Sequence, residues 1–368
     1  MMKYILSQKE RKYNMEKIVI TMPIAPYSDF SVGKMSTPIL AEMLAKKMKT
    51  KFVLSVNMLD SYKKRNIEQY QKLLDEYNIR PDYYWVDSAH VDELLQKIYY
   101  LISKKYIYEK QKKILTCDCK KVELSEENLK TINMKDSCFE IINDKYYCKS
   151  CGGECKFELR ECLVFNPNLI ENKNFIFFPK FINKDIKTFL ETVGKNEIIV
   201  TRTRQTGINI LYYDKKYNLD IDFLWGVYLS LFSNYDKIVL CSNHQLYQLY
   251  MVTMLEKCFE PNSKTISLAT PHLNVTDKKI EEELENRLIS LKLFIVLNQK
   301  WSKKENTFDV SLLKYINSMN VEKKKMLNDI IIESENVDDF ENELYSILMK
   351  KFNIQNANKE LKRRRKNV

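Results

Sequence analysis

Cysteines crowd into one short part of this chain, and their clustering constrains the fold more than any other feature. Seven of the nine cysteines lie between Cys117 and Cys162, in a chain of 368 residues. The N-terminus, M-M-K-Y-I-L-S-Q-K-E, has no apolar stretch followed by small residues, so no secretory signal is expected. In a reducing compartment, clustered cysteines indicate metal binding rather than disulfides. The sequence therefore predicts a cytoplasmic protein with a metal-binding segment.

Two close cysteine pairs carry the metal prediction. The first is C-D-C and the second is C-K-S-C-G-G, in which the glycines allow the turn to close. Four thiolates on two turns fit a structural zinc site, which leaves no open position for catalysis, whereas small buried cysteines seldom form two such pairs. The predicted zinc ligands are Cys117, Cys119, Cys148 and Cys151. Three other cysteines are alternative ligands: Cys138, Cys155 and Cys162.

The chain before the cysteines has the pattern of a nucleotide-binding α/β core. Apolar runs at 17–21 and 51–57 predict buried parallel strands. Periodic apolar positions predict amphipathic helices at 63–77 and 91–103, separated by a proline-containing link at 81–85. The order strand, loop, helix, strand predicts a doubly wound, Rossmann-like parallel sheet.

The first helix of this core is expected to begin after a long loop. Pro23 and Pro26 interrupt the chain after the first strand. Ser36 or Thr37 is a good N-cap, and Pro38 would then take the first helical position.

The same pattern resumes after the cysteines. Further strands are predicted at 174–178, 198–201, 237–241 and 291–297. The chain is expected to divide into an N-terminal extension at 1–15, the first half of the core at 16–110, the cysteine-rich insertion at 111–173, the second half of the core at 174–309, and a helical C-terminal region with a basic tail at 310–368.

The net charge of +11 favours polyanionic partners such as tRNA or nucleotide phosphates. A composition rich in lysine, asparagine, isoleucine and tyrosine explains the charge equally well, so charge alone decides little. The one concentrated basic run, at 359–368, is typical of a solvated tail and sometimes of a nucleic-acid contact. No apolar run approaches the roughly 20 residues that a membrane span needs.

A lysine-rich loop, K-W-S-K-K at 300–304, follows the predicted strand at 291–297. In α/β nucleotide folds, ligands bind at the carboxyl ends of the strands. Lysines at that position can neutralise a triphosphate during nucleotidyl transfer. The residues predicted to act in catalysis are Lys300, Ser302 and Lys303.

Taken in order, these motifs resemble the catalytic core of class I aminoacyl-tRNA synthetases of the methionyl type. K-W-S-K-K resembles the family's second signature loop, K-M-S-K-S, and P-Y-S-D-F-S-V-G-K at 26–34 resembles the segment that carries the first signature, H-I-G-H. The stretch at 105–113, the cysteine knuckle and T-R-T-R-Q-T-G-I at 201–208 resemble further family segments in the same order. The resemblance covers roughly residues 16 to 310.

This resemblance implies a protein that binds ATP with Mg²⁺, an amino acid and structural Zn²⁺, and that forms an aminoacyl adenylate. It implies an ATP site at Ser31, Gly33, Lys34 and Asn243. It implies an amino-acid site at Asn57, Trp225 and Tyr228.

The sequence also departs from the family. The two signature histidines are replaced by Ser31 and Lys34, and Asn57 stands where the family has an aspartate for the substrate's α-amino group. A neutral amide holds an ammonium group less well than a carboxylate. Only 64 of the 368 residues follow Lys304, which is too few for a helical anticodon-binding domain of ordinary size.

Three functions remain open at this point. The first is a truncated synthetase paralogue that transfers an activated amino acid to tRNA or to a small acceptor. The second is a non-catalytic paralogue that binds nucleotide, RNA or a protein partner. The third is a zinc-bearing nucleic-acid-binding module without a nucleotide site.

Overall fold

A computed structural model of the chain describes residues 17–26, 30–60, 66–129, 138–171, 175–179, 182, 188, 191, 196–203, 207–232, 234–242, 245–262, 264–273, 288–301, 305–306, 308–334 and 340–366. The predicted extension at 1–15 lies outside these residues, as do Ser302, Lys303 and Asn243.

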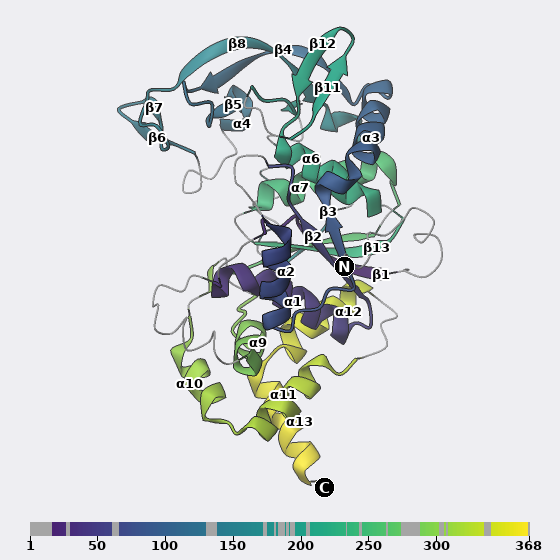
Figure 1. Ribbon diagram of the computed structural model, residues 1–368, viewed down its shortest axis with the longest axis vertical. Helices are drawn as coiled ribbons and strands as arrows, with labels where there is room; N and C mark the ends of the chain where they lie inside the picture. The colour runs from purple at the N-terminus through teal and green to yellow at the C-terminus, as the bar shows by residue number, and fades with distance from the viewer. Residues whose placement is uncertain are drawn as a thin grey trace.

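A six-stranded sheet forms the centre of the molecule (Figure 1). Its strands are β1 (Lys17–Thr21), β2 (Lys51–Val56), β3 (Tyr83–Val86), β9 (Ile176–Phe178), β13 (Asp236–Ser242) and β14 (Thr265–Thr270). They are all parallel and follow the order β3-β2-β1-β13-β14-β9. The direction of winding reverses between β1 and β13, and ligands bind at such a switch point in open α/β sheets. The doubly wound core predicted from the sequence is therefore confirmed.

Both faces of the sheet are buried, which explains why its strands are continuous apolar runs. Val19 and Ile238 belong to one hydrophobic core, whereas Ile18, Ile20 and Val239 belong to a second core on the opposite face. Successive residues of a strand point to opposite faces, so the apolar residues of β1 and β13 meet an apolar layer on each side.

Helices form these two layers on opposite sides of the sheet (Figure 1). One layer contains α1 (Val32–Lys47), α2 (Ile67–Glu76), α9 (Leu288–Leu297), α10 (Val310–Ser318), α11 (Val321–Ile332), α12 (Phe340–Ser346), a π-helical turn (Ile347–Lys351) and α13 (Ile354–Lys366). The other contains α3 (Val91–Ser103), α6 (Ile221–Leu229) and α7 (Leu246–Phe259). The predicted helical C-terminal region is confirmed, and its basic run belongs to α13. Among the described residues, no helix has the length and apolar character to cross a membrane.

The predicted cysteine-rich insertion belongs to an antiparallel unit at one end of the molecule, which also includes strands from residues 107–110 and 198–218 (Figure 1). Its four-stranded sheet has the order β10-β8-β4-β5, with β4 (Ile107–Thr116), β5 (Glu123–Ser125), β8 (Lys156–Phe165) and β10 (Ile198–Ile199). Smaller elements are the hairpin of β6 (Phe139–Ile142) and β7 (Lys145–Cys148), the hairpin of β11 (Asn209–Tyr212) and β12 (Lys215–Asn218), and the short helix α4 (Glu126–Leu129). The strand predicted at 198–201 thus joins the antiparallel sheet and not the central one.

The strand predicted at 291–297 is wrong, because these residues belong to helix α9. All seven side chains are buried, so the segment is apolar on every side and shows neither a strand nor a helix period. An apolar run of this length does not distinguish the two structures. Its single polar member, Lys292, is held by Glu42 of α1 (Nζ to Oε2, 2.7 Å) and by the carbonyl oxygen of Asn78 (2.7 Å).

The predicted start of the first helix is also wrong. α1 begins at Val32, directly after Ser31, so Pro38 lies inside the helix rather than at its first position. The Ser36 hydroxyl donates to the carbonyl oxygen of Gly33 (2.8 Å) and helps to hold this first part of the helix. The earlier start moves Gly33 and Lys34 from a loop into the first helical turn.

Strand β3 was not predicted at all, because its segment reads as a link between two helices. Tyr83 and Tyr84 are half-buried, whereas Trp85 and Val86 are buried. Two aromatic hydroxyls interrupt the apolar run, so the pattern of a buried parallel strand is absent from the sequence.

A fully buried ion pair joins α7 to the central sheet. Lys237 of β13 and Glu256 of α7 are both 0% exposed, and Nζ of Lys237 lies 2.7 Å from Oε1 of Glu256. Nζ also donates to the carbonyl oxygen of Phe232 (3.0 Å). Burial lowers the pKa of Lys237, and Glu256 opposes this by favouring the charged form. A buried charge that loses its partner is strongly destabilising.

We expect Lys237→Met to lower the free energy of unfolding by about 3–5 kcal/mol, since it leaves Glu256 buried without its partner. The double variant Lys237→Met/Glu256→Met should regain most of this loss, because two apolar chains of similar volume replace the pair. Urea unfolding at pH 7 measures both. As a control, Lys113→Met removes a half-exposed pair with Glu126 and should change stability by no more than about 0.5 kcal/mol. A double variant as unstable as Lys237→Met alone would contradict this account.

Candidate functional site

The N-terminus of α1 lies at the switch point of the sheet, because α1 follows β1 and the winding reverses between β1 and β13. Ser31 precedes the helix with an extended backbone, and Gly33 and Lys34 lie in the first turn. This turn contains no acidic residue. The free backbone N–H groups and the dipole of a helix N-terminus favour anions such as phosphate.

The segment that carries Lys300 is tied to the same place by a short parallel ladder. β15 (His272–Leu273) comes just after β14 and pairs with β16 (Glu305–Asn306), which comes just after the lysine-rich motif. The carbonyl oxygen of Leu273 lies 3.4 Å from the position that a Cβ on Gly33 would occupy. Lys300 therefore follows helix α9 and not a strand. The pairing of β16 with β15 nevertheless brings the chain just after the lysine-rich motif to the carboxyl end of β14.

Trp301 anchors this segment in the core. Its side chain is only 5% exposed, and its ring packs against Phe178, the last residue of β9, with 5.7 Å between ring centroids. Lys300 is half-buried beside it. Of the predicted phosphate-binding residues, Ser31, Gly33, Lys34 and Lys300 can be described, and the β15–β16 ladder links their segments.

Of the predicted amino-acid residues, Asn57 follows β2, whereas Trp225 and Tyr228 belong to α6 and lie near the end of β3. Asn57 is 2% exposed; its backbone N–H donates to the carbonyl oxygen of Ile24 (2.9 Å), and its Oδ1 accepts from the N–H of Asp60 (3.2 Å). Tyr228 is fully buried, and its hydroxyl donates to the carbonyl oxygen of Trp85. Tyr228 is thus held by the protein itself and forms part of the wall of this region.

Asp87 is the residue of this region that the sequence reading missed. It follows β3 directly and is 0% exposed. Its Oδ1 accepts from the backbone N–H groups of Met58 (2.6 Å) and Leu59 (3.1 Å), the two residues after Asn57. Burial raises the pKa of Asp87 to about 6, although these N–H groups and the side chain of Trp225 oppose the rise. An aspartate just after a strand is a recognisable signal, but the strand itself was not predicted.

Aromatic rings complete the wall around Asp87. The ring of His90 stacks on Trp85 with 3.7 Å between centroids, and its Nδ1 lies 2.8 Å from Oε2 of Glu93. Tyr228 lies beside both rings, at 6.0 Å from Trp85 and 6.2 Å from His90. The wall therefore combines rings from β3, from the short 3-10 turn that precedes α3 (Asp87–His90) and from α6.

Gly207 joins the loop after β2 to α6. Its N–H donates to the carbonyl oxygen of Leu59 (3.3 Å), and its φ of +83° lies in the left-handed region that favours glycine. A Cβ at this position would lie 2.8 Å from Cδ1 of Leu224 and 3.0 Å from the carbonyl oxygen of Leu219. This close approach requires glycine, in the segment that resembles a family motif.

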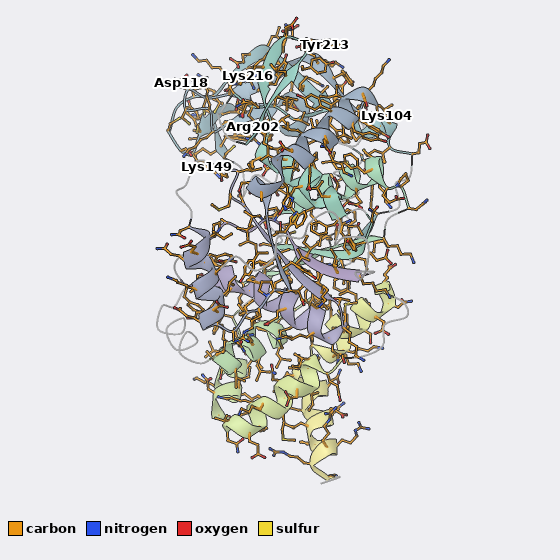
Figure 2. All side chains as sticks on the ribbon, turned by 45° about the vertical axis from the view of Figure 1, so that its right-hand side comes forward. Lys104, Asp118, Lys149, Arg202, Tyr213 and Lys216 are labelled. Carbon is orange, nitrogen blue, oxygen red and sulfur yellow. The ribbon has the colours of Figure 1, made fainter. Side chains whose placement is uncertain are left out.

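The four cysteines predicted as metal ligands come together in the insertion. Their sulfur atoms all lie within 4.8 Å of one another; Cys117 and Cys119 are 3.3 Å apart, and Cys119 and Cys148 are 3.6 Å apart. In a tetrahedral zinc site with Zn–S bonds of about 2.3 Å, the sulfurs lie about 3.8 Å from one another. The Val122 N–H donates to Cys117 (3.4 Å) and would stabilise a thiolate there. Asp118 and Lys149, the neighbours of these cysteines, lie on the same edge of the insertion (Figure 2).

The turn of the second pair depends on Gly152, whose φ is +69° and whose N–H donates to the carbonyl oxygen of Cys148 (2.8 Å). The three alternative ligands, Cys138, Cys155 and Cys162, lie outside the group of four. Burial raises the pKa of Cys155 to about 12, and Cys162 donates to the carbonyl oxygen of Lys110 (3.4 Å). The four sulfurs can hold a metal ion.

A polar groove of about 470 Å³ lies between β8 and β12. Arg202 and Lys216 line it and appear on the same side of the insertion in Figure 2. Its arginines are already paired, Arg202 with Asp220 (2.7 Å) and Arg160 with Glu123 (2.7 Å). The Arg160 pair joins β8 to β5, and the Arg202 pair reaches Asp220 at the start of α6, so the charges that line the groove are used in structural contacts.

Comparison with known proteins supports the fold. No family model and no curated protein matches this sequence. Among solved structures, the chain resembles methionyl-tRNA synthetase of Mycobacterium tuberculosis in complex with methionyl-adenylate, with a TM-score of 0.63 and 13% identity over 86% of this chain and 72% of that one. A second structure with bound methionyl-adenylate gives a TM-score of 0.60, 12% identity and coverages of 86% and 72%. The apo form of the same synthetase gives a TM-score of 0.61 and 13% identity, over 87% of this chain and 70% of that one. The chain thus shares the fold of this class I synthetase.

We expect Asp87→Asn to be more stable than the wild type at pH 7 and to lose this advantage at pH 4. The folded-state pKa of about 6 lies above the ordinary value of 3.8, so Asp87 contributes stability when protonated and loses it as the pH rises through 6. A difference of this size corresponds to roughly 3 kcal/mol. Urea unfolding of both proteins between pH 4 and pH 7 measures it. A stability difference that does not change with pH would contradict a buried, ionised Asp87.

Proposed function

We propose that this protein activates an amino acid with ATP, as a class I methionyl-tRNA synthetase-like ligase. One observation carries the proposal. The β15–β16 ladder links the segment of Lys300 to Gly33 at the α1 N-terminus, so the two motifs that resemble the family's signatures converge on one edge of the sheet.

In the proposed reaction, ATP binds as its Mg²⁺ complex at the α1 N-terminus. The first turn with Gly33 and Lys34 holds the phosphates, together with Ser31 and with Asn243 after β13. Lys300, Ser302 and Lys303 neutralise the charge that develops on the triphosphate as pyrophosphate leaves. Such chemistry needs positioning and charge neutralisation and no covalent nucleophile on the protein.

The amino acid binds beside Asn57, Trp225 and Tyr228, at the ends of β2 and β3. Its carboxylate attacks the α-phosphate of ATP, which yields the aminoacyl adenylate and pyrophosphate. A hydroxyl of tRNA or a nucleophile of a small acceptor then attacks the carbonyl carbon of the adenylate, which transfers the acyl group and releases AMP. Tyr228 shapes the amino-acid site through the packing of its ring near Trp85 and His90. Its hydroxyl is already hydrogen-bonded to the protein.

We expect the wild-type protein to catalyse ATP–pyrophosphate exchange with at least one of the twenty L-amino acids. Lys300→Ala should lower kcat of this exchange about a hundredfold with little change in the KM of the amino acid, because it removes a charge used in the transition state. Lys104→Ala, on an exposed helix end, is the matched control and should keep wild-type kcat. No exchange with any amino acid, in a protein that still binds ATP, would favour the non-catalytic paralogue instead.

We also propose that the four clustered cysteines hold one structural Zn²⁺ through their thiolates. The bound ion would fix the two cysteine turns of the insertion and leave no open coordination position. Elemental analysis of the purified protein should give about one zinc per chain. Cys119→Ser should remove most of it, whereas Cys138→Ser should retain it, because Cys138 lies outside the group of four. Equal loss in both variants would contradict this ligand set.

A further inference from the structure

A buried ion pair joins the two helices that lead to the candidate phosphate site. Nζ of Lys292 on α9 lies 2.7 Å from Oε2 of Glu42 on α1, and their side chains are 9% and 2% exposed. α1 has Gly33 and Lys34 in its first turn, and α9 ends shortly before Lys300. The pair therefore connects one helix that contains the first motif to another that leads into the second.

The same pair also binds a third segment, the turn between α2 and β3. Oε1 of Glu42 accepts from the backbone N–H of Arg80 (3.2 Å) and from Nζ of Lys46 (2.8 Å). Nζ of Lys292 donates to the carbonyl oxygen of Asn78 (2.7 Å), whose φ of +49° lies in the turn after α2. Burial lowers the pKa of Lys292, and Glu42 opposes this by favouring the charged form. Three segments thus meet at one carboxylate, and both of its oxygens are engaged.

Lys292 is the only polar residue between Leu291 and Leu297, all of which are buried. Hydrophobic contact is non-directional, so packing of an all-round apolar helix gives it few contacts that favour one orientation. A hydrogen-bonded charge pair has a defined geometry, and a buried polar contact can fix the register between two helices. The pair with Glu42 gives α9 the directional contact that its composition otherwise lacks.

The position of α9 is passed on to Lys300 by contacts at the base of the lysine-rich segment. Oδ1 of Asn298 accepts from the backbone N–H of Asp309 (3.1 Å), and Asn298 is 2% exposed. The ring of Phe308 packs on Phe294 of α9, with 4.6 Å between ring centroids. The chain that leaves α9 therefore returns to it before α10 begins, and Lys300 lies close to this closed base.

We propose that Glu42 and Lys292 are positioning residues for amino-acid activation: their ion pair sets the register of α9 on α1 and thereby places Lys300 relative to the first turn of α1. This inference rests on the proposed function, in which Lys300 and the α1 N-terminus act on the same triphosphate. Both side chains are buried in the helical layer, so they act through Lys300 and not on the substrate. A displacement of about 1 Å in a charge that stabilises the transition state lowers the rate of the reaction.

The test is ATP–pyrophosphate exchange with Lys292→Met, at a temperature at which circular dichroism shows every variant to be folded. We expect kcat to fall about 10- to 100-fold, as for a misplaced catalytic group. The KM of the amino acid should stay within about twofold of wild type, because Trp225 and Tyr228 belong to the layer on the other face of the sheet.

Lys237→Met is the matched control. It removes a similarly buried lysine from a glutamate at the same distance of 2.7 Å, but on the opposite face of the sheet and at the start of β13. Its kcat should stay within about twofold of wild type, because distant sites with no shared partners act independently.

A double variant separates positioning from stability. Glu42→Met/Lys292→Met replaces the pair with two apolar side chains and should regain part of the stability that Lys292→Met loses. We expect its kcat to remain as low as that of Lys292→Met, because apolar packing does not restore the direction of the contact. Glu42→Gln keeps the shape of the side chain without its charge and should also lower kcat, by less. It tests the same contact if Lys292→Met does not fold.

Hydrogen–deuterium exchange of the backbone gives a readout that does not need activity. Lys292→Met should speed deuterium uptake in α9 and at residues 298–301, whereas Lys237→Met should speed it in α7 and leave α9 unchanged. Absence of pyrophosphate exchange in the wild-type protein would contradict the proposed function. Faster deuterium uptake in α9 would then still support the placement of Lys300 by the pair, and unchanged uptake would overturn it.

Where the wild-type protein does catalyse pyrophosphate exchange, the kinetic results decide the inference by themselves. An unchanged kcat in Lys292→Met would overturn it and leave the proposed function intact. Recovery of kcat together with stability in the double variant, or an equal loss of kcat in Lys237→Met, would assign the pair a role in stability only and would overturn it as well.

Discussion

The rest of the structure depends on the burial of the parallel sheet on both faces. Helices cover each face, so ligands can approach only at the edge where the strands end. Residues far apart in the chain therefore meet there: Gly33 after β1, Asn57 after β2, Asp87 after β3 and Trp301 beside the end of β9. The composition of the candidate site follows from this constraint, because the ends of parallel strands lie at one edge of the sheet.

The sequence predicted those parts of the fold that leave a strong local pattern. The buried strands β1, β2 and β13, helix α3 and the four clustered cysteines each have a characteristic composition or spacing, and the structure contains them. Prediction from the sequence failed where a segment is buried on all sides and has no period, and where polar groups interrupt an apolar strand. α9 is apolar on all sides, and the tyrosines of β3 conceal a strand. Asp87 was missed as a consequence, since its meaning depends on following that strand.

Charged contacts connect the insertion to the core in addition to the apolar packing between them. Glu123 of β5 accepts from Arg160 and from the backbone and hydroxyl of Thr203, and Arg202 pairs with Asp220 at the start of α6. Burial lowers the pKa of Arg202, but the carboxylates of Asp220 and Asp222 raise it by more. The pKa of Arg202 therefore lies above its usual range. The base of the insertion and the helix that carries Trp225 therefore share one polar network, which fixes their relative orientation.

Trp301 gives the lysine-rich segment a property that the polar residues of the motif cannot supply. Its buried ring packs on Phe178, which in turn contacts Tyr345 of α12 with 6.1 Å between centroids. A chain anchored at Trp301 has fewer conformations to lose on ordering than an unanchored one, so less free energy is spent on ordering it. The same ring couples Lys300 and Trp301 to the C-terminal helices, so that their position depends on the whole layer beneath the sheet.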